Sequence, residues 1–137
     1  MNEEHLIIEG YTKKPIVIDF DKCRISEDIG YELDHAAREY GFYAVMSEVV
    51  EDKYRAYKFK FDTWRAEILL METNKTGKKM TEGEKELFVI NAPKYAEFQA
   101  VGNRIKRDFE VLKAYASALQ IKASLVQSKS ANRRKEL

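Results

Sequence analysis

One stripe of apolar and aromatic residues limits the folds open to this chain. The stripe recurs in alternating steps of four and three and has Ser47 as its one polar member: Ile29, Leu33, Ala36, Tyr40, Tyr43, Ser47, Val50, Tyr54, Tyr57, Phe61, Trp64, Ile68, Met71. Such heptad spacing predicts one long α-helix that buries this face against other helices. A helix of this length spans roughly 63 Å. Because a compact domain of this size does not cover such a rod, we expect covering helices from other copies of the chain.

A second stripe with the same spacing predicts a second long helix towards the C-terminus. Its members are Tyr95, Phe98, Gly102, Ile105, Phe109, Leu112, Ala116, Leu119, Ala123 and Val126. Between the two stripes, Thr81 and Glu84 match a capping box and open a short helix that carries Leu87, Phe88 and Ile90. Pro93 is expected in the first turn of the last helix.

The first 25 residues have a different composition. Two short β-branched runs, at 6–8 and 16–20, flank a polar stretch with Gly10 and Pro15. They predict either a hairpin or an extended arm, which has to dock on helices because an isolated hairpin is marginal in water. Ser26 is expected to cap the first long helix, which runs to about Thr73, and Gly41 allows a break in it. A polar, basic connector follows at 73–79.

These patterns together predict an all-α fold. Two long heptad-patterned helices, a short helix between them and a small N-terminal extended arm are expected to associate into an oligomeric helical bundle. We assign residues 1–25 to the arm and residues 26–137 to a helical oligomerisation and nucleic-acid-binding domain.

Charge is distributed unevenly along the chain. Residues 1–52 hold 13 acidic and 5 basic side chains, a net charge of −8, whereas residues 53–137 hold 10 acidic and 19 basic, a net charge of +9; together they give the overall +1. This polarity suits a protein that meets a polyanion with one end. It equally suits head-to-tail pairing of acidic and basic surfaces within an oligomer.

The sequence lacks the motifs of the common catalytic and metal sites. It has no phosphate-binding glycine loop, no CxxC, no HExxH and no GxSxG, and His5, His35 and Cys23 lie apart from one another. We therefore predict no enzyme: no catalytic residue, no metal site and no cofactor. A single cysteine fits a reducing cytoplasm, and no apolar run approaches the ~20 residues of a membrane span. A cytoplasmic protein without a membrane partner is expected.

The basic, aromatic segment from 53 to 65 is the strongest functional candidate. The heptad places Lys58 and Lys60 beside the buried stripe and Phe59 on the opposite side. Single-stranded nucleic acid is bound by base stacking on aromatic rings combined with cations along the backbone. The predicted nucleic-acid-binding residues are Lys58, Lys60, Arg55, Phe59 and Arg65. The alternative is that the two lysines form interhelical salt bridges and Phe59 packs on another helix.

The stretch Ala56-Tyr57-Lys58-Phe59-Lys60-Phe61-Asp62-Thr63-Trp64 resembles the basic, amphipathic segment of the UvsY-type recombination mediators of bacteriophages. In that family an Ala and a hydrophobic residue precede Lys, a small residue, a basic residue, a hydrophobic residue and Asp, followed by aromatics. Lys58 and Lys60 fall on the two basic positions, and Phe59 stands where the family has a small residue.

The resemblance implies a ring-like homo-oligomer that binds single-stranded DNA. Such a protein helps to load a RecA-like recombinase onto DNA coated by single-strand-binding protein, and a phage-encoded one acts in the host cytoplasm. The main alternative is a coiled-coil interaction protein of a phage, an adaptor or an inhibitor, that binds no nucleic acid. A regulator of duplex DNA is a weaker third hypothesis, because the sequence shows no helix-turn-helix signal.

Overall fold

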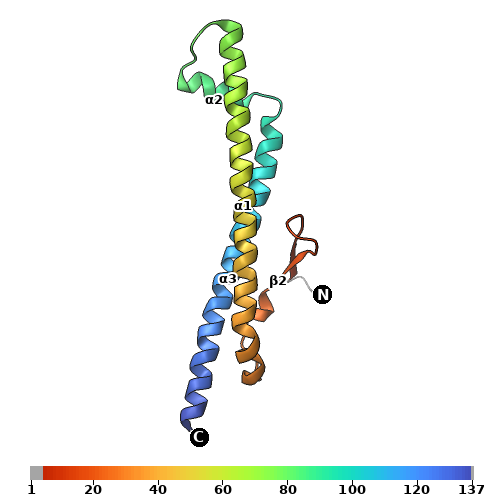
Figure 1. Ribbon diagram of the computed structural model, residues 1–137, viewed down its shortest axis with the longest axis vertical. Coiled ribbons are helices and arrows are strands. Elements are labelled where there is room, and N and C mark those ends of the chain that lie inside the picture. The colour runs from red at the N-terminus through yellow and green to blue at the C-terminus, as the bar shows by residue number, and fades with distance from the viewer. Residues whose placement is uncertain (1–4, 137) are drawn as a thin grey trace. The chain divides into compact units, whose positions relative to one another are not determined.

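The computed structural model describes residues 5–136 (Figure 1). In chain order its elements are β1 (His5–Ile8), β2 (Ile16–Asp19), a 3-10 turn η1 (Phe20–Cys23), α1 (Ile29–Thr76), α2 (Glu82–Ile90) and α3 (Tyr95–Glu136). The predicted all-α fold is confirmed, with two long helices, a short one between them and a small N-terminal arm. The break that Gly41 allowed is absent, because α1 is continuous across it.

The chain divides into two compact units. We call Met1–Glu51 with Asp108–Leu137 the arm unit, and Asp52–Arg107 the aromatic unit. Both α1 and α3 contribute residues to each unit. The assignment of residues 1–25 and 26–137 to an arm and a helical domain stays a prediction.

The N-terminal arm is a hairpin. β1 pairs antiparallel with β2 in a register that sets Leu6 opposite Ile18 and Ile8 opposite Ile16. Because side chains alternate along a strand, Ile8, Ile16 and Ile18 share one face, and they are only 5%, 3% and 0% exposed. The chain turns between the strands through Gly10, whose φ of +97° is favourable only for glycine. Of the two alternatives, the hairpin is therefore correct.

Two boundaries of α1 differ from the prediction. Ser26 is not the cap: Asp28 Oδ1 accepts the Tyr31 backbone N–H at 3.0 Å, and α1 begins at Ile29. Asp caps as well as Ser and adds a negative charge at the positive end of the helix, so it competes successfully. At its other end α1 continues past Thr73 to Thr76, where Gly77 adopts φ +67° and donates its N–H to the Thr73 carbonyl at 2.8 Å. A glycine in this left-handed conformation ends a helix.

Thr81 is confirmed as the cap that opens α2, although Glu84 returns its bond to the Thr81 hydroxyl and not to the backbone N–H of a capping box. The Thr81 hydroxyl oxygen accepts the Glu84 backbone N–H at 3.2 Å and lies 3.1 Å from Glu84 Oε1. Pro93 lies in the turn that precedes α3 rather than in its first turn, because α3 begins at Tyr95.

In the arm unit, the first half of α1 and the second half of α3 lie antiparallel and form the core with the hairpin (Figure 1). The rings of Tyr43 and Tyr115 are 4.6 Å apart between centroids. The largest fully buried side chains of the molecule all belong to this unit: Tyr115, Ile18, Leu112, Leu119, Val50 and Val126. The α1 stripe is thus covered here by α3 of the same chain, not by another copy as expected, because the chain returns alongside α1 after α2. Oligomerisation itself stays a prediction.

Tyrosines hold the hairpin on the two helices. The Tyr43 hydroxyl donates to the Val17 carbonyl at 2.8 Å, and the Tyr115 hydroxyl donates to the Asp19 carbonyl at 3.1 Å. Each bond satisfies a backbone carbonyl of β2 with a donor from a different helix. Burial raises the pKa of both phenols, so they stay protonated and able to donate.

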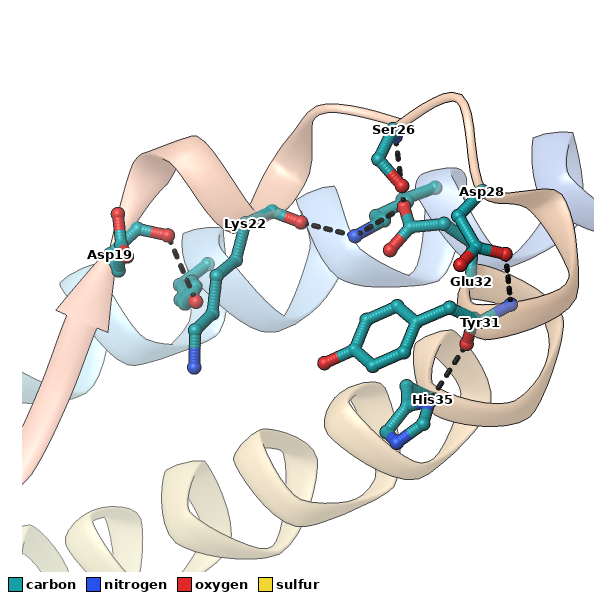
Figure 2. Close-up of polar contacts among 9 residues, drawn as sticks. Asp19, Lys22, Ser26, Asp28, Tyr31, Glu32 and His35 are labelled. Atoms are coloured by element: carbon teal, nitrogen blue, oxygen red, sulfur yellow. Dashed lines mark hydrogen bonds and ion pairs between the residues drawn. The ribbon is translucent and has the colours of Figure 1, made fainter.

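A buried ion pair completes the arm unit (Figure 2). Lys122 Nζ lies 2.9 Å from Glu32 Oε2, and the two side chains are only 5% and 6% exposed. Lys122 also donates to the Lys22 carbonyl of η1, while Glu32 accepts the Ser26 backbone N–H at 3.3 Å. The pair therefore joins α1, α3 and the segment that connects the hairpin to α1.

Candidate nucleic-acid interface

The basic segment lies on α1 within the aromatic unit, and α3 determines which way it faces. The Tyr57 hydroxyl donates to the Phe98 carbonyl at 2.6 Å. A Cβ placed on Gly102 would collide with the ring and hydroxyl of Tyr57, so only glycine admits the ring there. These two contacts fix the rotation of this part of α1 about its own axis.

A cluster of aromatic rings reinforces this orientation. Phe61 lies 5.8 Å from Trp64 and 5.6 Å from Phe98 between ring centroids, and Trp64 lies 4.9 Å from Phe98. Such pairs contribute about 0.5–1.5 kcal/mol each beyond their buried area. The rings of Phe61 and Trp64 stay only half-buried, however, and their ring contacts outside α1 are with Tyr95 and Phe98 of α3. The α1 stripe is confirmed as the packed face from Tyr54 to Ile68, whereas Met71 at its end is 70% exposed.

The predicted binding residues lie outside that packed face. Phe59 is 74% exposed, and Lys58, Lys60 and Arg55 are exposed as well, whereas Arg65 is half-buried. The heptad expectation that Phe59 points away from the buried stripe is confirmed. Their role in binding stays a prediction.

Two of the cations have neighbours within the helix. Lys58 Nζ lies 5.8 Å from the centroid of the Tyr54 ring, a cation–π distance. Arg55 Nη1 lies 3.2 Å from Asp52 Oδ1 in an exposed ion pair, which leaves its positive charge partly neutralised. Lys58 and Lys60 form no ion pair among the residues that the structure describes.

The cations do not form a single cluster. At about 100° per residue, Lys58 and Arg65 lie on one flank of the packed stripe, with Arg55 further round on that side. Lys60 lies on the other flank, and Phe59 lies between the two flanks on the outer side of α1. A strand of nucleic acid that touched every candidate would therefore cross the outer side of the helix.

Positive charge is concentrated in this unit. The aromatic unit holds 13 basic and 8 acidic residues, a net charge of +5, whereas the arm unit holds 11 basic and 15 acidic, a net charge of −4. The asymmetry seen along the sequence is therefore also an asymmetry between the two structural units.

Other kinds of site find little support in the described part of the chain. Residues 5–136 contain no group of three His, Cys, Asp or Glu side chains placed to hold a metal ion. Cys23 is half-buried, and burial raises the pKa of its thiol, which disfavours the reactive thiolate. Across the same residues, every helix is too short or too polar to span a bilayer.

One surface was not predicted from the sequence. Besides its packed stripe, α1 carries another heptad stripe, displaced from the packed one by two residues. It includes Phe59 and Leu70, which are 74% and 62% exposed. The four-and-three spacing that revealed the packed stripe was also the signal for this one.

Comparison of the chain with protein-family models, with curated proteins and with solved structures finds no match to any of them.

Proposed function

We propose that the aromatic unit binds single-stranded DNA and that the protein acts as a recombination mediator. One observation carries the proposal: a large aromatic side chain, Phe59, is 74% exposed between two exposed lysines on the positively charged unit. An exposed ring next to cations is the arrangement that binds bases by stacking and phosphates by charge. Lys58 and Lys60 contact phosphates, assisted by Arg55 and Arg65.

Binding of this kind is strongly sensitive to salt. Each phosphate neutralised on a single strand contributes about −0.7 to the slope of log affinity against log salt concentration. Since Arg55 is partly neutralised by Asp52, the remaining three cations give a slope of about −2 per protomer. Several protomers on one strand would multiply weak contacts into avidity.

Fluorescence anisotropy of a labelled single strand of about 30 nucleotides, measured across a salt series with the duplex as control, tests the proposal. We expect tight, salt-dependent binding that prefers the single strand. The double variant Lys58→Ala/Lys60→Ala should abolish it, whereas Lys13→Ala/Lys14→Ala, an equal change of charge in the hairpin of the arm unit, should leave it intact. Absence of binding by the unmodified protein at low salt would refute the proposal.

The mediator step rests on the resemblance of residues 56–64 to the UvsY-type segment. We expect the protein to stimulate a RecA-like recombinase on DNA coated by single-strand-binding protein. Strand exchange with and without the protein measures this stimulation directly. A protein that binds the strand yet leaves loading unchanged would be a single-strand binder of another kind.

A second candidate is a coiled-coil interaction protein without nucleic-acid binding. The exposed apolar residues Phe59 and Leu70 on the outer side of α1 favour it. The two candidates predict different partners for Phe59: a nucleic-acid base in the first, and another helix in the second.

A further inference from the structure

The outer face of α1 in the aromatic unit carries its own heptad stripe. We define this outer face as Ala56, Phe59, Thr63, Ala66, Leu70 and Thr73, which are spaced in steps of three and four. Each member follows a residue of the packed stripe by two positions, or about 200° around the helix, so this face lies opposite the packed one. Phe59 and Leu70 are 74% and 62% exposed, and Ala56, Thr63 and Ala66 are exposed as well.

The outer face is uncharged in a chain of which 34% of the residues are charged. Heptad spacing with exclusion of charge is typical of a helix face that packs against a second helix. Within the aromatic unit α3 occupies the opposite side of α1, as the contacts of Tyr57 with Phe98 show. The occupant of the outer face therefore comes from elsewhere.

We propose that the occupant is the outer face of a second copy, paired antiparallel about a two-fold axis. A two-fold interface must be self-complementary, so that each contact occurs twice. In one register Phe59 packs against Leu70 of the second copy, Thr63 packs against Ala66, and Ala56 packs against Thr73. The two bulky layers then flank a central layer of small side chains, across which the helices approach closely.

Charge complementarity supports the same register. Residues that flank the contact on one side meet their counterparts in an antiparallel pair, which sets Lys60 opposite Glu67 of the second copy, twice. Both residues are exposed, and neither forms an ion pair among the residues that the structure describes. On the other flank, Asp62 meets Leu69, so this register places no two like charges together.

The neighbouring registers each bring like charges together. A shift by one heptad step in one direction sets Lys60 against Lys60 and Asp62 against Asp62 of the second copy. A shift in the other direction sets Glu67 against Glu67. Because like charges repel at such positions, the flanking residues favour the proposed register, which alone of the three has no like-charge contact.

The proposed pair shares two side chains with the proposed DNA site, Phe59 and Lys60. A paired protomer buries Phe59, so base stacking and pairing are alternative uses of that side chain. Lys58 and Arg65 flank the packed stripe rather than the outer face and remain accessible in the pair. Lys58→Ala/Arg65→Ala therefore weakens DNA binding without changing the dimer, which keeps the two proposals separately testable.

Charge reversal tests the register. Sedimentation velocity of the full chain over a concentration series should show a monomer–dimer equilibrium. Lys60→Glu and Glu67→Lys each replace two attractive contacts by two repulsive ones and should raise the dissociation constant about tenfold. The double variant Lys60→Glu/Glu67→Lys restores attraction and should return it to within about twofold. A chain that is monomeric at every concentration, or a dimer indifferent to all three variants, would overturn the proposal.

Cross-linking provides an independent measurement. In a Cys23→Ser background, Thr63→Cys/Ala66→Cys should form disulfide-linked dimers on mild oxidation, since these positions face each other across the axis. Ala56→Cys alone is the control, because it faces position 73 and not itself. Equal cross-linking by both variants would contradict the register, and circular dichroism verifies that the helices are intact.

Discussion

The arm unit and the aromatic unit are built from the same two helices but are stabilised differently. In the arm unit the hairpin adds a third element, and six large side chains become fully buried. In the aromatic unit the corresponding α1 residues, Tyr54, Tyr57, Phe61 and Trp64, are only half-buried. The third element of the aromatic unit, α2, has only nine residues and buries only Val89, so it leaves more of the apolar surface of α1 exposed than the hairpin does in the arm unit.

The difference extends to polar interactions and charge. The arm unit buries an ion pair and anchors β2 through two tyrosines, and its net charge is −4. The aromatic unit relies on ring contacts around Phe61 and Phe98 and has a net charge of +5. Because of its greater burial, we expect the arm unit to be the more stable of the two, and we expect the exposed rings and cations of the aromatic unit to provide an interaction surface.

The greatest loss of stability is expected from the buried ion pair of the arm unit. Lys122→Ala leaves Glu32 buried and unpaired, which should lower the free energy of unfolding by about 3–5 kcal/mol. Urea denaturation followed by circular dichroism measures the loss. Lys22→Ala is the matched control and should cost less than about 0.5 kcal/mol, because only the backbone carbonyl of Lys22 contacts Lys122.

The same variant tests whether the two units unfold separately. Trp64 is the only tryptophan and belongs to the aromatic unit, so its fluorescence reports that unit. A Trp64 transition that shifts together with the circular dichroism shows that the units unfold as one. If Lys122→Ala lowers the free energy of unfolding by less than about 1 kcal/mol, the ion pair is far weaker than its burial indicates.

The next effect concerns the close helix contact of the aromatic unit. Gly102→Ala places a Cβ in collision with the Tyr57 side chain and forces the helices apart, at a cost of about 1–3 kcal/mol. Trp64 fluorescence during denaturation is the measurement. Gly41→Ala, where no atom lies within 4 Å of the added Cβ, should instead stabilise the protein by about 0.5–1 kcal/mol. Equal effects at both positions would contradict the close contact.

Removing one tyrosine hydroxyl from each unit compares the contributions of the two hydrogen bonds to stability. Tyr115→Phe removes the bond to the Asp19 carbonyl, and Tyr57→Phe removes the bond to the Phe98 carbonyl. Each should cost about 1 kcal/mol in denaturation experiments, and more where water cannot replace the lost donor. We expect the greater loss at Tyr115, which is 0% exposed. A greater loss at Tyr57 would reverse the ranking of the two units.

The smallest expected effect is a loss of stability at alkaline pH, with no loss at neutral pH. Burial raises the pKa of Tyr115, Tyr43 and Tyr57 above the ordinary value of about 10. The stability that these neutral phenols contribute is fully present below the unfolded-state pKa and is lost as pH rises through the folded-state value. Ultraviolet titration of tyrosinate should show these three phenols ionising above about pH 10, with their Phe variants identifying each step. Simultaneous ionisation of all tyrosines near pH 10 in the folded protein would contradict this.

Local patterns in the sequence predicted the helices and their packed faces. Spacing of four and three identified both stripes, and the Thr81 capping box identified α2, because helix periodicity and capping depend on neighbours within a few residues. Local sequence did not decide whether Ser26 or Asp28 caps α1, since either side chain can accept the first free N–H groups. Likewise, whether Gly41 breaks the helix depends on packing, which here keeps α1 continuous through the glycine.

Residue type and local spacing were therefore enough to specify the three helices, their apolar faces and the charge asymmetry. Long-range packing decided which segments of the chain cover those faces. It placed Lys122 in a buried ion pair with Glu32 and set Tyr57 against Gly102. Each of these outcomes joins residues distant in the chain, and a pattern confined to one helix carries no information about such contacts.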